Sequence, residues 1–321
     1  MNNFQLVALK SFLFLLTIFW CHSAFSLGDL KAPGDPEFPK HKIGYSLSIN
    51  KITDETLSYA KSVGVDYIEV SGMTSFFNSE GKLKKTEDEL EELFTKAKEK
   101  LDRSGIKVWS IHMAFGKEVD ISLYDDKKIN DIIERHLTVL NYVKLLNPRY
   151  ILFHPSYYIE KGKREAHKEQ LQNSVELLNQ EVNDIGSTLV IENMLGPELM
   201  KGEVERPLMR TIEETQELFE GFPENVGLAI DVNHIKNPEN LIRAMGHRLK
   251  TVHVADGSGE AENHYMPCSG LGKNNWNKVF KALYEVEYKG VFLYESPKYD
   301  DEKEFKECYD TLYQNFRDSL K

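Results

Sequence analysis

The stretch GLAIDVNH, residues 227–234, shows the pattern from which the fold is predicted. It is a short apolar run followed by acidic and imidazole side chains. Seven other stretches contain a comparable apolar, β-branched or aromatic run: KIGYSLS (42–48), DYIEVSG (66–72), KVWSIHM (107–113), YILFHPS (150–156), TLVIEN (188–193), KTVHVAD (250–256) and GVFLYES (290–296). Their continuous apolar character is typical of strands that are buried on both faces. The sequence therefore predicts eight strands of a parallel sheet.

Helical segments separate these strands. The clearest extends from Thr86 to Arg103, where Thr86 and Glu89 have the spacing of a capping box and Gly105 follows as a C-terminal cap. Others are expected near 53–62, 127–146, 165–184, 211–221, 238–247, 275–286 and 303–318. Eight strand–helix units within residues 42–321 match the size of one α/β domain, a (β/α)8 TIM barrel. The alternative, an open doubly wound sheet, usually has a glycine-rich phosphate loop after its first strand, and YSLSINKITDET (45–56) has none.

The N-terminal residues 1–26, MNNFQLVALKSFLFLLTIFWCHSAFS, have the features of a secretory signal peptide. Lys10 is their only charge, an apolar block follows it, and Ala24 and Ser26 supply small residues before a cleavage site. An uncleaved anchor is the alternative. Residues 27–41 contain three prolines and are expected to be a linker. We expect a secreted or periplasmic protein with no stable membrane span after cleavage, in which Cys268 and Cys308 either pair or remain free thiols.

Composition excludes several classes of protein. The 321 residues are 41% hydrophobic and 28% charged, which fits a globular chain and not a disordered one. The net charge of −11 makes the surface repel phosphate backbones, so no nucleic-acid partner is expected. A homo-oligomer is compatible with the sequence.

Polar side chains gather where the expected strands end, which in a TIM barrel is where the active site lies. The strand ends and the loop after the seventh strand carry His112, His154, Glu192, Asp231, His234, His253, Glu262, His264 and Glu295. Several ionised carboxylates in one cleft would repel one another, and a divalent cation removes that repulsion. Imidazole and carboxylate together suit zinc, manganese, iron or cobalt better than calcium. Any one of these residues alone could be a hydrogen-bonded structural residue, but together they predict a metal site.

The motifs IEN (191–193), DVNH (231–234) and HVAD (253–256), with His264, Gly270, Gly272, Trp276 and Glu295, resemble the xylose isomerase-like TIM-barrel superfamily. The resemblance covers essentially all of residues 42–321. In the ketose 3-epimerase branch a divalent metal is held by Glu, Asp, His and Glu, which implies the ligands Glu192, Asp231, His253 and Glu295. The same branch implies that His234 and Glu198 contact substrate. Residues 254–262 contain no Arg or Lys, unlike that branch, which leaves the substrate open.

The endonuclease IV branch of the superfamily binds three zinc ions. Its ligands match His112, His154, Glu192, Asp231, His234, His253, Glu262, His264 and Glu295, with Glu262 in place of an Asp. The acidic charge and the signal peptide argue against a role in DNA repair.

The expected function is therefore that of a metal-dependent sugar isomerase or epimerase acting on a keto-sugar or sugar derivative. Glu192 and Glu295 would be the catalytic acid and base, moving a proton through an ene-diolate. The cofactor would be Mn, Co, Zn or Mg, and substrate would contact His112, His154, His234, His264, Glu198 and Glu262. The alternatives are an endonuclease IV-like zinc phosphodiesterase, a sugar dehydratase or lyase on the same site, and a sugar-binding barrel without turnover.

Overall fold

The computed structural model describes residues 38–297 and 299–321, so the expected signal peptide and most of the expected linker lie outside the described residues. Residues Pro39–Lys321 form one compact unit. A barrel domain beginning at residue 42 stays a prediction. His41, just before that boundary, is buried, and its backbone N–H donates to the Tyr309 hydroxyl at 2.6 Å.

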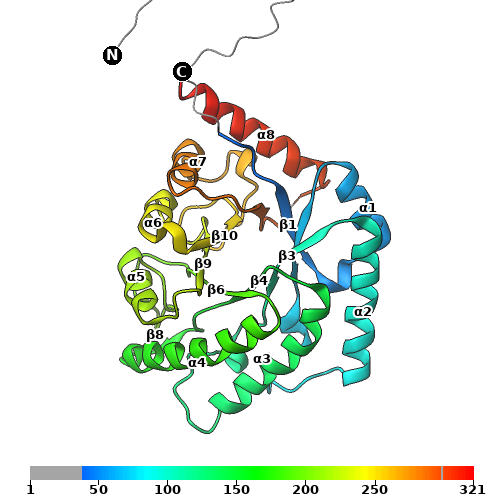
Figure 1. Ribbon diagram of the computed structural model, residues 1–321. Helices are drawn as coiled ribbons and strands as arrows, with labels where there is room; N and C mark the ends of the chain where they lie inside the picture. The colour runs from blue at the N-terminus through cyan, green and yellow to red at the C-terminus, as the bar shows by residue number, and fades with distance from the viewer. Residues whose placement is uncertain (1–37, 298) are drawn as a thin grey trace, which may run out of the picture. The chain divides into compact units, whose positions relative to one another are not determined.

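Eight parallel strands close into a barrel in chain order, and α-helices surround it (Figure 1). The strands are β1 (Ile43–Ser48), β2 (Tyr67–Ser71), β3 (Lys107–His112), β4 (Tyr150–Phe153), β6 (Thr188–Glu192), β9 (Gly227–Asp231), β10 (Leu249–Val254) and β11 (Phe292–Tyr294). The helices are α1 (Asp54–Ser62), α2 (Glu87–Ser104), α3 (Ile129–Val143), α4 (Arg164–Asp184), α5 (Ile212–Gly221), α6 (Pro238–Met245), α7 (Trp276–Glu285) and α8 (Lys303–Asp318). The predicted (β/α)8 TIM barrel is confirmed.

Local sequence signals explain where helix α2 begins and ends. The Thr86 hydroxyl accepts from the Glu89 N–H, and the Glu89 carboxylate accepts from the Thr86 N–H at 2.8 Å, which completes the expected capping box. The chain leaves the helix at Gly105, whose φ of 69° is a left-handed conformation that glycine adopts without strain.

The register of the strands brings polar residues to one end of the barrel. Asp231 of β9 pairs directly with His253 of β10, and Glu192 of β6 pairs with Ala229 of β9. The Glu295 N–H, just after β11, donates to the Val254 carbonyl of β10 at 3.0 Å. The barrel interior below them is filled by apolar and aromatic side chains, among them Trp109, Tyr150, Leu152, Val190 and Leu293.

A three-stranded antiparallel sheet, which the sequence did not predict, is added beside the barrel. Its strands are β5 (Ile159–Glu160), β7 (Met200–Lys201) and β8 (Val204–Glu205), in the order β5-β8-β7. They come from the segments that follow β4 and β6, so this small sheet fixes two of the loops at the carboxyl end of the barrel.

A disulfide between Cys268 and Cys308 answers the question that the sequence left open. It joins the segment that follows β10 to helix α8, across a sequence separation of 40 residues. The bridge therefore fastens the loop that carries Glu262 and His264 to the last helix of the barrel.

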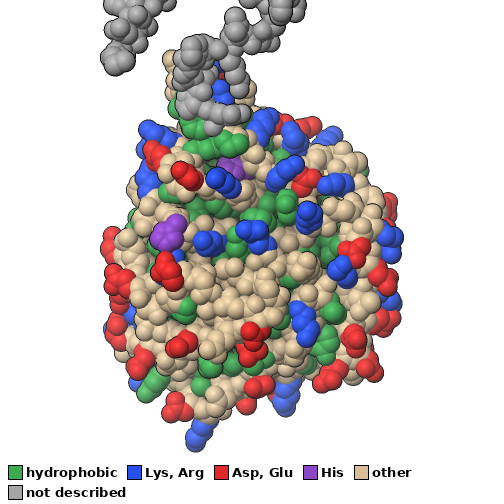
Figure 2. Space-filling view, viewed as in Figure 1, with side chains coloured by type: hydrophobic (Ala, Val, Ile, Leu, Met, Phe, Trp, Pro, Cys, Tyr) green, Lys and Arg blue, Asp and Glu red, His purple; other side chains and the backbone are tan. Residues whose placement is uncertain are grey.

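Basic residues lie within three positions of the amino-terminal ends of five strands, namely Lys42, Lys107, Arg149, Lys250 and Lys289, and the acidic Asp66 directly before β2 pairs with Lys42. Figure 2 shows Lys and Arg side chains gathered over the middle of one face of the molecule, with Asp and Glu mainly around its edge. Among the described residues, no helix has the length and apolar character needed to cross a membrane.

Candidate metal centre

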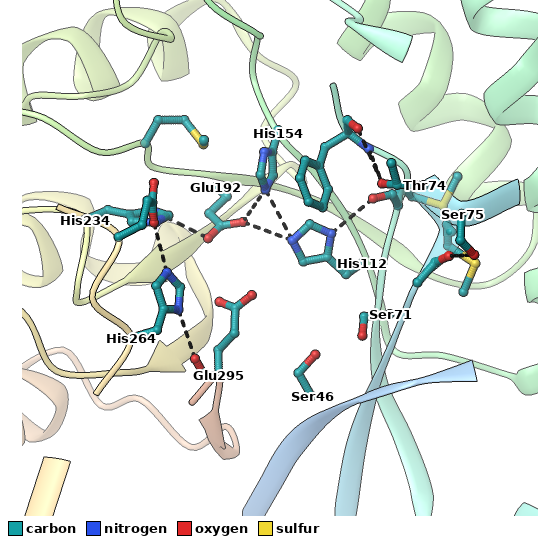
Figure 3. Close-up of a pocket in the computed structure, with 16 residues that line it drawn as sticks. Ser46, Ser71, Thr74, Ser75, His112, His154, Glu192, His234, His264 and Glu295 are labelled. Atoms are coloured by element: carbon teal, nitrogen blue, oxygen red, sulfur yellow. Dashed lines mark hydrogen bonds and ion pairs between the residues drawn. The ribbon is translucent and has the colours of Figure 1, made fainter. Parts of the chain in front are cut away.

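A cavity of about 640 Å³ opens at the carboxyl ends of the strands (Figure 3). It is lined by Ser46, Ser71, Gly72, Met73, Thr74, Ser75, His112, Met113, Phe115, His154, Glu192, Met194, His234, Glu262, His264 and Glu295. The lining combines hydroxyl, imidazole and carboxylate groups and includes no Arg or Lys among these residues. Its size is that of a small-molecule site.

Four of the predicted residues form a central group. Glu192, Asp231, His253 and Glu295 each offer one ligand atom, and these four atoms all lie within 4.8 Å of one another. The first three side chains are essentially inaccessible to solvent, whereas 22% of the Glu295 side chain is exposed. The parallel register explains their meeting, because each residue stands at or near the carboxyl end of a neighbouring strand.

The central group has the unsatisfied atoms that a bound cation would satisfy. Glu192 Oε2, Asp231 Oδ2, His253 Nδ1 and Glu295 Oε2 are all buried and form no hydrogen bond. His253 Nδ1 lies 2.7 Å from Glu295 Oε2, but the two are not aligned for a hydrogen bond. Each buried polar atom left without a partner lowers the stability of the folded state by about 1–3 kcal/mol. This donor set of one imidazole and three carboxylates fits a divalent cation such as Zn or Mn.

Charge in the site is balanced by shifted pKa values. Burial alone would lower the pKa of His112, but the adjacent Glu192 and other nearby carboxylates outweigh it and raise the pKa to about 9. Burial would raise the pKa of Glu295, yet His253 lowers it to about 2. Burial dominates at Asp231 and raises its pKa to about 6. In the metal-free protein, protonated imidazoles such as that of His112 thus balance part of the negative charge of these carboxylates.

Glu69 is a member of the site that the sequence analysis missed. It lies in β2 and is completely buried. Its Oε2 accepts a hydrogen bond from the Ser110 hydroxyl at 2.7 Å and lies 3.0 Å from His253 Nε2. When His253 Nε2–H donates to Glu69, the other ring nitrogen, Nδ1, presents a lone pair to the central group. A single acidic residue inside the apolar run YIEVS was the available signal.

A second group of possible ligands flanks the first on one side. His112 and His154 approach Glu192 Oε2 at 3.6 and 3.2 Å, and these three residues also have the spacing of a metal site (Figure 3). Phe115 stacks on the His154 ring, with centroids 4.5 Å apart. Burial lowers the pKa of His154, which favours the neutral imidazole that binds metals or hydrogen-bonds to a ligand.

A third group lies on the opposite side of the central group. Asp231, His234 and His264 have ligand spacing, and Glu262 Oε2 lies 2.9 Å from His234 Nε2 and 3.0 Å from His264 Nε2. Glu192 belongs to the first two groups and Asp231 to the central and third groups. Nine predicted residues are therefore gathered in one place.

Glu198 is the predicted site residue that the structure does not bring to the cavity. It is exposed, lies between β6 and β7, and is absent from the cavity lining. Its expected contact with substrate stays a prediction, as do the individual roles of the other site residues.

The chain is similar in sequence to a known protein and similar in structure to others. An uncharacterised protein of Methanocaldococcus jannaschii is 24% identical over 203 residues, which are 62% of this chain and 74% of that protein. A D-tagatose 3-epimerase-like protein has a similar structure, with a TM-score of 0.69, 18% identity, and coverage of 87% of this chain and 100% of its own. The 3-keto-D-glucoside 4-epimerase of E. coli also has a similar structure, with a TM-score of 0.62 and 17% identity. The alignment covers 88% of this chain and 98% of the epimerase chain.

At these identities the structural similarities demonstrate a shared fold. The family is decided by a separate match, because the model of the xylose isomerase-like TIM barrel family matches residues 57–315. With the closed barrel and the ligand groups at its carboxyl end, the chain belongs to the xylose isomerase-like TIM barrel family.

Proposed function

We propose that the protein is a metal-dependent sugar isomerase or epimerase that acts on a keto-sugar or a keto-sugar derivative. The observation that carries the proposal is the pairing of two carboxylates, Glu192 and Glu295, around one candidate cation site within a cavity of sugar size. The proteins of similar structure include a D-tagatose 3-epimerase-like protein and a 3-keto-D-glucoside 4-epimerase, which supports this reaction class.

The lining of the cavity favours a neutral substrate. Ser46, Ser71 and Thr74 offer hydroxyl groups that can exchange hydrogen bonds with sugar hydroxyls, and the lining residues include no Arg or Lys to pair with a phosphate. A phosphorylated sugar would therefore be held less well than a free sugar or a glycoside.

The proposed mechanism assigns proton transfer to the two glutamates. A divalent cation held by Glu192, Asp231, His253 and Glu295 would supply Lewis-acid stabilisation of the negative charge that develops on the substrate oxygens. Burial opposes the ionisation of Glu192 and Glu295, but imidazole neighbours outweigh it and keep the pKa of both carboxyls low. Both are therefore ionised at neutral pH and can accept a proton from the carbon next to the carbonyl. Return of a proton to the opposite face gives epimerisation, and return to the neighbouring carbon gives isomerisation.

Exchange of substrate hydrogen with solvent deuterium tests the proposal. Keto-sugars would be incubated in D₂O with protein reconstituted with Mn, Co, Zn or Mg, and exchange followed by NMR. Exchange on the carbon next to the carbonyl is expected, and Glu295→Gln should slow it by about 10²–10⁴-fold. Absence of exchange for every keto-sugar and metal would contradict the proposed function.

A second candidate function, a multi-metal phosphodiesterase, is favoured by one specific observation. The two flanking groups, His112–His154–Glu192 and Asp231–His234–His264, could hold two further cations beside the central one. Metal analysis of the purified protein distinguishes the candidates: one ion per chain supports the sugar enzyme, whereas three ions and cleavage of a phosphodiester would replace it.

We also propose that the protein is secreted or periplasmic. The sequence of residues 1–26 and the Cys268–Cys308 disulfide support an oxidising compartment. N-terminal sequencing of the mature protein should find cleavage after Ser26; an intact N-terminus would instead favour the anchor.

A further inference from the structure

A second cavity, of about 880 Å³, has no part in the proposed proton transfer. It lies between the segment that joins β3 to α3 and the segment that joins β4 to α4, and Val204 of β8 contributes to its wall. Its lining residues are Lys117, Asp120, Leu123, Tyr124, Tyr157, Tyr158, Glu160, Lys163, His167 and Val204. The small sheet β5-β8-β7 therefore supports part of this cavity.

The two cavities are neighbours along both of these segments. Phe115 lines the first cavity and Lys117 the second, and His154 lines the first and Tyr157 the second. Two and three residues of extended chain span at most about 7 and about 11 Å. The walls of the two cavities therefore lie within about 11 Å of each other at these points, a distance on the order of the length of two linked sugar rings.

Tyrosine rings dominate the second cavity. Tyr124 and Tyr157 are 59% and 41% exposed, which is high for aromatic side chains. The Tyr158 ring packs edge-on against Tyr157 with centroids 5.2 Å apart, and its hydroxyl accepts from Lys201 Nζ at 2.7 Å. Rigid tyrosines provide flat apolar faces together with hydroxyl groups at the edge, and a sugar ring has the matching combination of C–H faces and hydroxyl edges.

The cavity also contains a buried polar group that is available to a ligand. With Asp120 ionised, the Ser122 hydroxyl donates its one hydrogen to Asp120 Oδ1 at 2.7 Å, and His167 Nδ1–H then donates to the same hydroxyl oxygen, 2.8 Å away. Nε2 of the neutral ring is then a hydrogen-bond acceptor. It forms no hydrogen bond to any residue within 38–297 or 299–321, and His167 lines the cavity.

The charges around the cavity favour a neutral occupant. Lys117 and Lys163 are matched in number by Asp120 and Glu160, so the lining has no excess of either sign. We propose that the second cavity binds a remote sugar ring of a glycoside whose keto-sugar unit occupies the first cavity. The substrate class is then a keto-glycoside with a sugar aglycone. This inference rests on the proposed function for the identity of the reacting unit.

Two probes with the same reacting unit test the inference: a keto-disaccharide and the methyl glycoside of the same keto-sugar. The methyl glycoside fills only the first cavity. In the wild-type protein kcat/KM should be higher for the disaccharide. Tyr157→Ala and the more exposed Tyr124→Ala should each lower the ratio of the two kcat/KM values by about tenfold, through a higher KM for the disaccharide. Tyr59→Ala is the control, because Tyr59 has the same 41% exposure on helix α1 and should leave the ratio unchanged.

Calorimetric titration of the disaccharide separates the two proposals. Equal turnover of both probes would overturn the second-cavity inference and leave the proposed function standing. No turnover of either probe, with disaccharide binding that Tyr157→Ala weakens, would overturn the proposed function and support the cavity. If neither probe is turned over or bound, both proposals fail.

Discussion

Replacement of Glu69 should weaken metal binding although Glu69 does not belong to any of the ligand groups. Its Oε2 lies 3.0 Å from His253 Nε2, and both side chains are completely buried. A hydrogen bond to a charged group contributes about 1.5–3 kcal/mol, and each 1.4 kcal/mol changes an equilibrium constant tenfold. Glu69→Leu removes both the charge and the acceptor, so it should lower metal affinity about 100-fold. Glu69→Gln retains an acceptor oxygen and should lower it about tenfold.

Isothermal titration of chelator-treated protein with Mn or Zn measures this effect. Glu239→Gln is the matched control, because Glu239 is a buried glutamate of helix α6 that belongs to none of the ligand groups. Its metal affinity should equal that of the wild type, and circular dichroism should show that all three variants are folded. Wild-type affinity in Glu69→Leu would refute the idea that Glu69 orients the His253 ring.

Three further predictions concern catalysis, the disulfide and pH. Glu295→Gln should slow turnover by about 10²–10⁴-fold while the protein keeps its far-ultraviolet circular dichroism, and near wild-type turnover would exclude Glu295 as an acid or base. Joint replacement of Cys268 and Cys308 by Ser should lower the free energy of unfolding by about 4 kcal/mol, the loop-closure value for 40 residues, measured by denaturant titration; an unchanged midpoint would contradict the bridge. Because the pKa of His112 is raised to about 9 despite its burial, through Glu192, its contribution to stability is complete below pH 6.5 and lost as pH rises through 9. Thermal melts in chelator should therefore fall in midpoint between pH 6.5 and 9, and a flat or rising midpoint would count against this charge arrangement.

The sequence predicted the barrel because its strands are buried on both faces and each carries a continuous apolar run. The helix boundaries were predictable where caps are explicit, as at Thr86 and Gly105. The small sheet β5-β8-β7 was not predictable, because strands of two residues are too short to show any periodic pattern.

The site was predictable to the extent that barrel geometry constrains it. Residues at strand ends, such as Asp231 and His253, meet because parallel register fixes their positions. Glu69 was missed because the inward orientation of a residue within a strand depends on its pairing with both neighbouring strands, which the apolar pattern alone does not give. Glu198 lies beyond the strand, where the chain continues into β7 and the barrel no longer fixes its position.

Once the site imidazoles are neutral, the basic residues near the amino ends of the strands and the carboxylates at the opposite end separate charge along the barrel axis. Such a field repels a small cation from one pole and draws it toward the other while the ion is still diffusing in solvent. Metal capture by the chelator-treated protein should accordingly slow as ionic strength rises, because added salt shortens the range of this attraction.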